Sequence, residues 1–290
     1  MALAAGIEEG TIQGMVEERH ILPDINRLSV LTATIMLAYA LTRYVNIEPI
    51  KLGFKFLGVL LSFQIDFKTI VSVLVAALAA TGSDWLLRDH PALLGSARGW
   101  RSTLQHWILP ALTAWVIGVP LNTLATSPEW WIVFGMSGVL LVLVFIAEYS
   151  VADVADIRHP AATVGLTALS FALYLILAIA VRSAGFRLYL MLPALALAVW
   201  MVSLRTLYLR LGGKWLFAWA SVIAVVVGQI AMALHYWPLS PIRFGLILLG
   251  PSYALTSLVG GLEEGRPVQG WLVEPAIMLS LLWGLAFWLV

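Results

Sequence analysis

The chain has 290 residues, of which 61% are hydrophobic and only 11% are charged, and its mean hydropathy is +0.93. Soluble domains carry about 25% charged residues, so this composition excludes a soluble globular domain and is typical of a protein that lies in a bilayer. The formal net charge of +1 gives no clustered basic face for a nucleic acid, and the lack of cysteine excludes disulfides, thiolate catalysis and Cys-ligated metals.

Residues 1–27 precede the first long apolar segment. Glu8 and Glu9 stand where a signal peptide would have a basic region, so we predict no cleaved signal. Apolar side chains between residues 7 and 22 recur at roughly helical spacing, which is compatible with a helix lying along the membrane interface or with a solvated tail. We therefore predict a cytosolic N-terminal tail over 1–27 and a single transmembrane helical bundle over 28–290.

Nine apolar segments are long enough to cross the hydrocarbon core of a bilayer, which needs about 20 residues of helix. Tryptophan stands at several of their ends, where its amphipathic ring prefers the headgroup level. The second segment is rich in alanine and glycine, which let helices approach closely in lipid, so we expect it to be an inner helix. The predicted spans of this all-α polytopic membrane protein are 28–45, 67–87, 107–124, 130–149, 161–181, 186–204, 215–237, 243–259 and 271–290.

The segment between the first two spans, residues 50–67, alternates polar and apolar side chains. From Lys51 to Phe56 and from Ser62 to Phe67 the period is two, which predicts a pair of half-buried strands with a turn near Gly58. A short amphipathic helix over the same residues competes with this interpretation, because the run is too short for its periodicity to decide. The charged residues in it exclude a membrane crossing. We predict a short extracytoplasmic β-hairpin or amphipathic flap between spans 1 and 2.

Nine spans place the two termini on opposite sides of the membrane. Of the 17 Lys and Arg residues, more fall on the N-terminal side than on the other, and the excess grows when the lysines of the flap are left out. The positive-inside rule then favours a cytosolic N-terminus. We place the protein in a bacterial cytoplasmic membrane.

Two predicted loops on the cytosolic side share a short pattern, in which an aspartate is followed by five residues and then by His-Pro-Ala. If the loops converge, their carboxylates and imidazoles could bind a divalent metal or perform acid-base catalysis. The candidate catalytic residues are Asp84, His90, Asp153, Asp156 and His159. A simpler interpretation stays open, in which the aspartate ends one helix and His-Pro starts the next. The pattern assigns no particular metal or cofactor.

Four polar side chains fall within the predicted spans: Glu148, Gln229, His235 and Glu274. An ionisable group in hydrocarbon costs roughly 2.5 kcal/mol or more, so each is a candidate functional residue. All except Gln229 lie near span ends, from which they could reach interfacial water. Gln229 is the deepest of the four and is expected to form an interhelical hydrogen bond.

Three basic residues cluster at the cytosolic end of the sixth predicted span: Arg205, Arg210 and Lys214. Such a cluster could contact an anionic lipid headgroup. It is equally explained as an anchor of the positive-inside kind. The expected partners are therefore the lipid bilayer and an anionic lipid, and no protein partner is indicated.

Two functions of different class are compatible with these features. The favoured one is a non-enzymatic structural, partner-binding or transport-related bundle, because the chain carries no specific catalytic, nucleotide-binding or metal motif. The alternative is a membrane-embedded metal-dependent or acid-base enzyme that acts on a lipid or lipid-linked substrate at the cytosolic face. The enzyme would use the two paired loops, so convergence of His90 and His159 would separate the two hypotheses.

Overall fold

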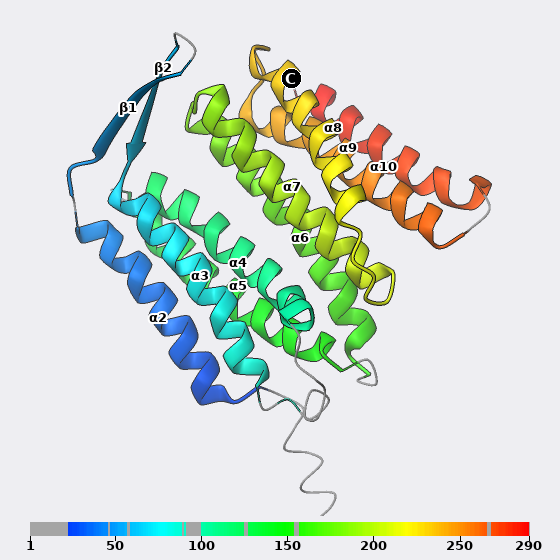
Figure 1. Ribbon diagram of the computed structural model, residues 1–290, viewed down its shortest axis with the longest axis horizontal. Coiled ribbons are helices and arrows are strands. Elements are labelled where there is room, and N and C mark those ends of the chain that lie inside the picture. The colour runs from blue at the N-terminus through cyan, green and yellow to red at the C-terminus, as the bar shows by residue number, and fades with distance from the viewer. Residues whose placement is uncertain are drawn as a thin grey trace, which may run out of the picture.

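The computed structural model describes residues 23–45, 47–56, 59–88, 90, 100–124, 127–153, 157–265 and 268–289. Most of the predicted N-terminal tail lies outside these residues. The elements within them are α2 (Ile25–Tyr44), β1 (Ile50–Phe56), β2 (Val59–Ile65), α3 (Phe67–Leu87), α4 (Trp100–Thr123), α5 (Trp130–Val151), α6 (His159–Ser183), α7 (Leu188–Arg210), α8 (Phe217–His235), α9 (Pro241–Glu263) and α10 (Val268–Trp288) (Figure 1).

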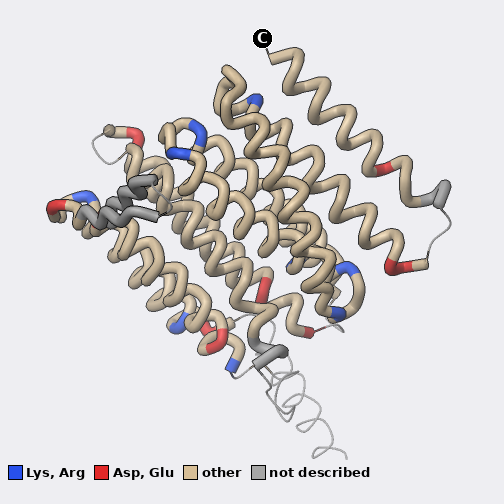
Figure 2. The backbone as a smooth tube through the Cα atoms, turned by 45° about the horizontal axis from the view of Figure 1, so that its top comes forward, with Lys and Arg blue, Asp and Glu red and all other residues tan. Residues whose placement is uncertain are grey.

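Nine helices among the described residues are long and apolar enough to cross a membrane. The chain is therefore a polytopic helical membrane protein by length and composition, as predicted. Charged residues gather toward the ends of the helices, and long stretches between them carry none (Figure 2). This is the distribution expected where the middle of each helix lies in hydrocarbon.

The strands β1 and β2 pair antiparallel, with Ile50 opposite Ile65 and Phe56 opposite Val59. They follow α2 and lead directly into α3, and Figure 1 shows them at the end of the bundle where α2 ends and α3 begins. The predicted turn at Gly58 lies outside the described residues. An extracytoplasmic location for this pair stays a prediction.

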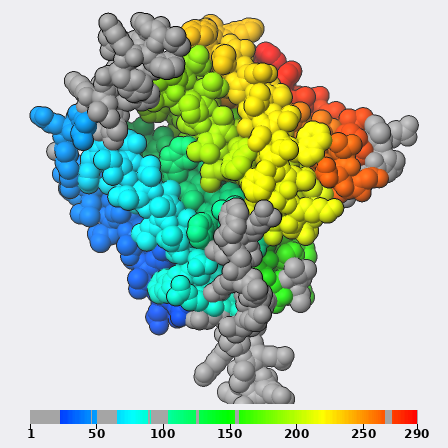
Figure 3. All heavy atoms as spheres, viewed as in Figure 1, coloured from blue at the N-terminus to red at the C-terminus, as the bar shows by residue number. Residues whose placement is uncertain are grey.

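The most enclosed helices are α4 and α9, whereas the alanine-rich α3 was expected to be an inner helix. In α4, which packs against α2, α3, α5, α6 and α7, 61% of the span Leu104–Thr123 is buried, against 44% for α3. Figure 3 shows part of α4 in the gap between α3 and α7. The small residues of α3 instead allow close approach on one side, since a Cβ on Gly82 would lie 2.3 Å from Leu31 Cδ1 of α2.

The last two helices approach each other closely because glycines of α9 face bulky side chains of α10. A Cβ built on Gly261 would lie 2.6 Å from the Cβ of Trp271, and one on Gly250 would lie 2.9 Å from Leu279 Cδ1. The Cβ of Trp271 is fixed to its backbone, so it cannot move away unless α10 moves.

We therefore expect Gly261→Ala to lower the free energy of unfolding by about 1–3 kcal/mol, the usual penalty of overpacking. The measurement is reversible unfolding of the purified protein, titrated with SDS in mixed micelles. Gly284→Ala on α10 is the matched control, because nothing lies within 4 Å of its added Cβ. Equal stability of the two variants would show that the α9–α10 contact tolerates an added methyl group.

Candidate functional site

Three ionisable side chains meet inside the bundle where α4, α5 and α7 pack against one another. His106 is 4% exposed, and Glu148 and Arg205 are each 1% exposed. His106 lies near the beginning of α4, and the other two lie near the ends of α5 and α7. The alternation of helix direction places these three helix ends on the same side of the membrane as the beginning of α2. We call these three residues the buried triad.

One carboxylate oxygen of Glu148 holds the triad together. Glu148 Oε2 accepts hydrogen bonds from His106 Nδ1 at 2.9 Å and from Arg205 Nη2 at 2.5 Å. Because an ionised carboxylate can only accept, His106 must carry a proton on Nδ1. With Nε2 unprotonated the triad is neutral, and a proton on Nε2 gives it one net positive charge.

Four polar atoms of the triad have no hydrogen-bond partner among the described residues. They are His106 Nε2, Glu148 Oε1, Arg205 Nε and Arg205 Nη1. A buried polar group without a partner costs about 1–3 kcal/mol, and more when it is charged. Such atoms are therefore expected to contact something that enters the bundle, such as a water molecule or a small polar ligand.

A second ion pair in the same chain shows the contrast. Arg210 Nε donates to Glu264 Oε1 at 2.6 Å and Arg210 Nη2 to Glu264 Oε2 at 3.3 Å, while Nη1 donates to the carbonyl and hydroxyl oxygens of Ser257. All three guanidinium nitrogens and both carboxylate oxygens are used, as in a bidentate structural pair. Gly260 makes room for it, since a Cβ there would lie 2.9 Å from Arg210 Cδ. The buried triad, in contrast, leaves four of its polar atoms without a hydrogen-bond partner among the described residues.

Two tyrosines lie close to triad residues along the chain. The ring of His90 lies 4.4 Å from the ring of Tyr149, centroid to centroid, and Tyr149 follows Glu148 in α5. On the other side, Arg205 Cζ lies 5.9 Å from the ring centroid of Tyr208. His90 is only 4% exposed. One of the predicted site residues therefore packs against α5 at the residue that follows Glu148.

Three of the other predicted catalytic residues lie at the same end of the bundle. Asp84 lies in the last turn of α3, Asp153 just follows α5, and His159 begins α6 with its Nδ1 buried and without a hydrogen-bond partner. Asp156 is outside the described residues. Within the part of the chain that is described, no group of three His, Asp or Glu residues could hold a metal ion. A joint site of His90 and His159 stays a prediction.

The predicted basic cluster at the end of α7 is dispersed by pairing. Arg205 turns into the bundle toward Glu148, and Arg210 pairs with Glu264. A contact of this cluster with an anionic lipid stays a prediction. Arg205 and Arg210 are five residues apart, which puts them on different faces of a helix with 3.6 residues per turn. Only Lys214 stays exposed.

Of the four polar residues predicted to lie within the spans, only Glu148 is buried. Glu148 was expected to reach interfacial water and is instead buried in the triad. Glu274 accepts a hydrogen bond from the hydroxyl of Tyr253, His235 ends α8, and Gln229 lies on an exposed face of α8 rather than between helices. An acidic residue within a span is thus the one sequence signal that pointed to the triad.

A family described as "Protein of unknown function (DUF5656)" matches residues 47–289. No curated protein and no solved structure gives a match. The matched range includes all three residues of the buried triad.

Proposed function

The chain belongs to this family of unknown function, whose description carries no activity, and we propose that it is a non-enzymatic, transport-related membrane bundle in which the buried triad binds and releases a proton. Ionisable groups inside membrane spans commonly mark ion pathways and proton relays. Histidine is the side chain whose charge changes near neutral pH. In this chain an imidazole and a guanidinium share one carboxylate oxygen.

The observation that carries the proposal is the set of unused hydrogen-bonding atoms in the triad. Glu148 Oε1 and His106 Nε2 can each take up a proton, and Arg205 keeps donors free for a water molecule or a small polar solute. A pair that only fastened helices together would be expected to use both carboxylate oxygens, as Arg210 and Glu264 do. The triad therefore has the composition expected of a site that binds and releases a proton.

The test is proton entry into vesicles that contain the full chain. With a pH-sensitive dye inside and a potassium diffusion potential as driving force, we expect the wild-type protein to admit protons faster than protein-free vesicles. His106→Gln should lower that rate by about 100-fold, the scale of removing a proton-transfer group. This variant keeps the Glu148–Arg205 pair, so the bundle stays folded.

Glu264→Gln is the control for this assay, because it disturbs an ion pair at the same end of the bundle without touching the triad. Its proton entry should equal that of the wild type. Wild-type rates no faster than those of empty vesicles, or unchanged rates in His106→Gln, would contradict the proposal.

We also propose that the end with the triad faces the cytosol, which the excess of Lys and Arg on that side supports. Cysteines introduced at Lys214 and Ser183 report on the two sides, because both positions are exposed and the chain has no other cysteine. In intact cells, an impermeant maleimide should label the cysteine at position 183. The one at position 214 should react only after permeabilisation, and the reverse pattern would place the triad at the outer side.

A further inference from the structure

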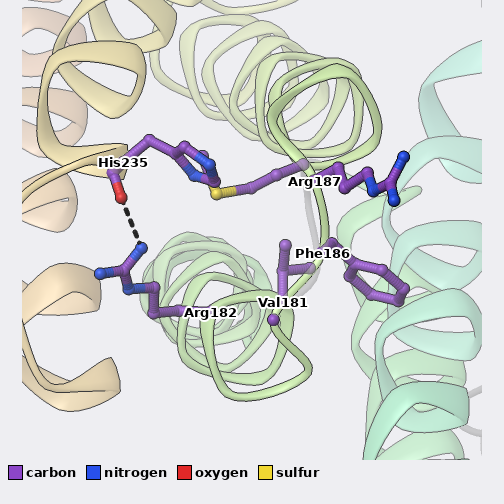
Figure 4. Close-up of a pocket in the computed structure, with 7 residues that line it drawn as sticks. Val181, Arg182, Phe186, Arg187 and His235 are labelled. Carbon is purple, nitrogen blue, oxygen red and sulfur yellow. Dashed lines mark hydrogen bonds between the residues drawn. The ribbon is translucent and has the colours of Figure 1, made fainter. Parts of the chain in front are cut away.

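The end of the bundle opposite the triad holds a pocket of about 260 Å³ between the end of α6, the beginning of α7 and the end of α8 (Figure 4). It is lined by Val181, Arg182, Gly185, Phe186, Arg187, Met191 and His235. Polar and apolar groups are thus mixed in it, and the polar ones are all basic.

The positive charge of this pocket is not neutralised by the described part of the protein. Arg182 donates to the backbone carbonyls of His235 and Trp237, each at 2.8 Å, so its guanidinium is held in place by neutral acceptors. None of the ion pairs found among the described residues includes Arg182 or Arg187. Two arginines therefore line the pocket, and neither has a counterion among the described residues.

Two further features favour an anion at this position. The helix α7 begins at Leu188 without a side-chain cap, so the positive end of its dipole lies beside the pocket. The Nδ1 atom of His235 is buried and has no hydrogen-bond partner. In Figure 4, Arg182 points toward the His235 carbonyl, whereas the exposed Arg187 extends away and must swing back to meet a ligand.

The surroundings place the pocket at headgroup level. Tyr236 is 79% exposed, Trp237 62% and Phe186 44%, and exposed aromatic rings of this kind mark the interface of a membrane protein. Leu190 of α7 and Met232 of α8 offer exposed apolar surface further along these two packed helices. An amphipathic ligand could thus place its charged group in the pocket and its chains along α7 and α8.

We propose that this pocket binds the phosphate diester of a phospholipid headgroup, with Arg182 and Arg187 as its charged contacts. Arginine matches phosphate oxygens through directed, charge-assisted hydrogen bonds. The site is distinct from the triad and does not depend on proton transfer. It also differs from the predicted lipid contact, which lies at the other end of α7.

Native mass spectrometry of the full chain tests the proposal. The protein in mild detergent is incubated with phosphatidylglycerol or with a galactosyl diacylglycerol of the same acyl chains, which lacks phosphate. We expect one phosphatidylglycerol to be retained in preference to the galactolipid. Arg187→Gln should weaken this retention by about 10-fold, the scale of losing one charge-assisted bond, and Arg182→Gln with Arg187→Gln should abolish it.

Arg43→Gln is the matched control, since Arg43 ends α2 at the same side of the bundle and packs over Trp130 and Trp131. It should retain the lipid as the wild type does. The Arg187 side chain forms no hydrogen bond or ion pair with the described residues, so its variant separates lipid binding from stability. Equal retention in the arginine variants and the control, or equal retention of the galactolipid, would overturn the proposal.

Inorganic phosphate distinguishes a lipid from a free ion. If phosphate alone raises the melting temperature of the wild type but not of Arg187→Gln, and no phosphatidylglycerol is retained, the pocket is a site for a free anion and the lipid assignment is overturned. Retained phosphatidylglycerol that millimolar phosphate does not displace supports the lipid.

Discussion

Replacing Glu148 by alanine is expected to lower the free energy of unfolding by about 3–5 kcal/mol, the usual result of removing one partner from a buried ion pair. Glu148 and Arg205 are each 1% exposed, so the variant would leave a guanidinium buried with no charged partner. His106 Nδ1 would lose its acceptor at the same time. The quantity to measure is the midpoint and slope of unfolding by SDS in mixed micelles.

Glu264→Ala provides the comparison, because it breaks an ion pair of similar length that water can reach. The side chains of Arg210 and Glu264 are 25% and 17% exposed. Exposed pairs contribute about 0–1 kcal/mol, and this partly buried pair should lie nearer that range than the triad does. If Glu148→Ala loses no more stability than Glu264→Ala, the ion pair between Glu148 and Arg205 contributes no more to folding than a partly exposed pair does.

Hydropathy located all nine apolar helices of the described residues, but it predicted both ends only for the second span. The second predicted span coincides with α3 at both ends, since Asp66 and Arg88 enclose it. The third was predicted to begin at Trp107, whereas α4 begins at Trp100. The residues between these two positions include Gln105 and His106. Both are compatible with a helix but are unfavourable in hydrocarbon, and hydropathy measures only the preference for hydrocarbon.

The candidate site could be predicted only in part. Glu148 stood out because an acid within a span is costly, but its partners are 42 and 57 residues away along the chain. Their meeting depends on how α4, α5 and α7 rotate about their axes when they pack, and near-uniform apolarity leaves that rotation without a sequence signal. Arg205 was therefore interpreted as an anchor at a helix end, although it faces the core.

The pattern of paired Asp and His loops illustrates the opposite difficulty. Sequence spacing singled out His90, which packs against Tyr149 of α5, and no metal-binding group is found among the described residues. A repeated spacing can thus draw attention to one end of a bundle, because loops at that end lie on the same face. It does not identify which side chains meet there.

Replacing the whole triad by apolar residues should separate its role in folding from its role in function. The variant is His106→Leu with Glu148→Leu and Arg205→Met. Taking each charge of the buried pair out of water costs several kcal/mol, and the attraction between the two charges can offset only part of this. We therefore expect the triple variant to be as stable as the wild type or more stable, by up to about 4 kcal/mol.

Proton entry into vesicles should nevertheless fall to the protein-free rate in the triple variant, since it has no group in the triad that can carry a proton. Unfolding in SDS and dye-reported proton entry are measured on the same preparation, so a loss of activity cannot be attributed to a loss of fold. If the triple variant is stable and still conducts as the wild type does, the triad only fastens α4, α5 and α7 together. Stability without conduction would instead identify the unused atoms of His106 and Glu148 as the reason why this costly cluster is kept inside the membrane.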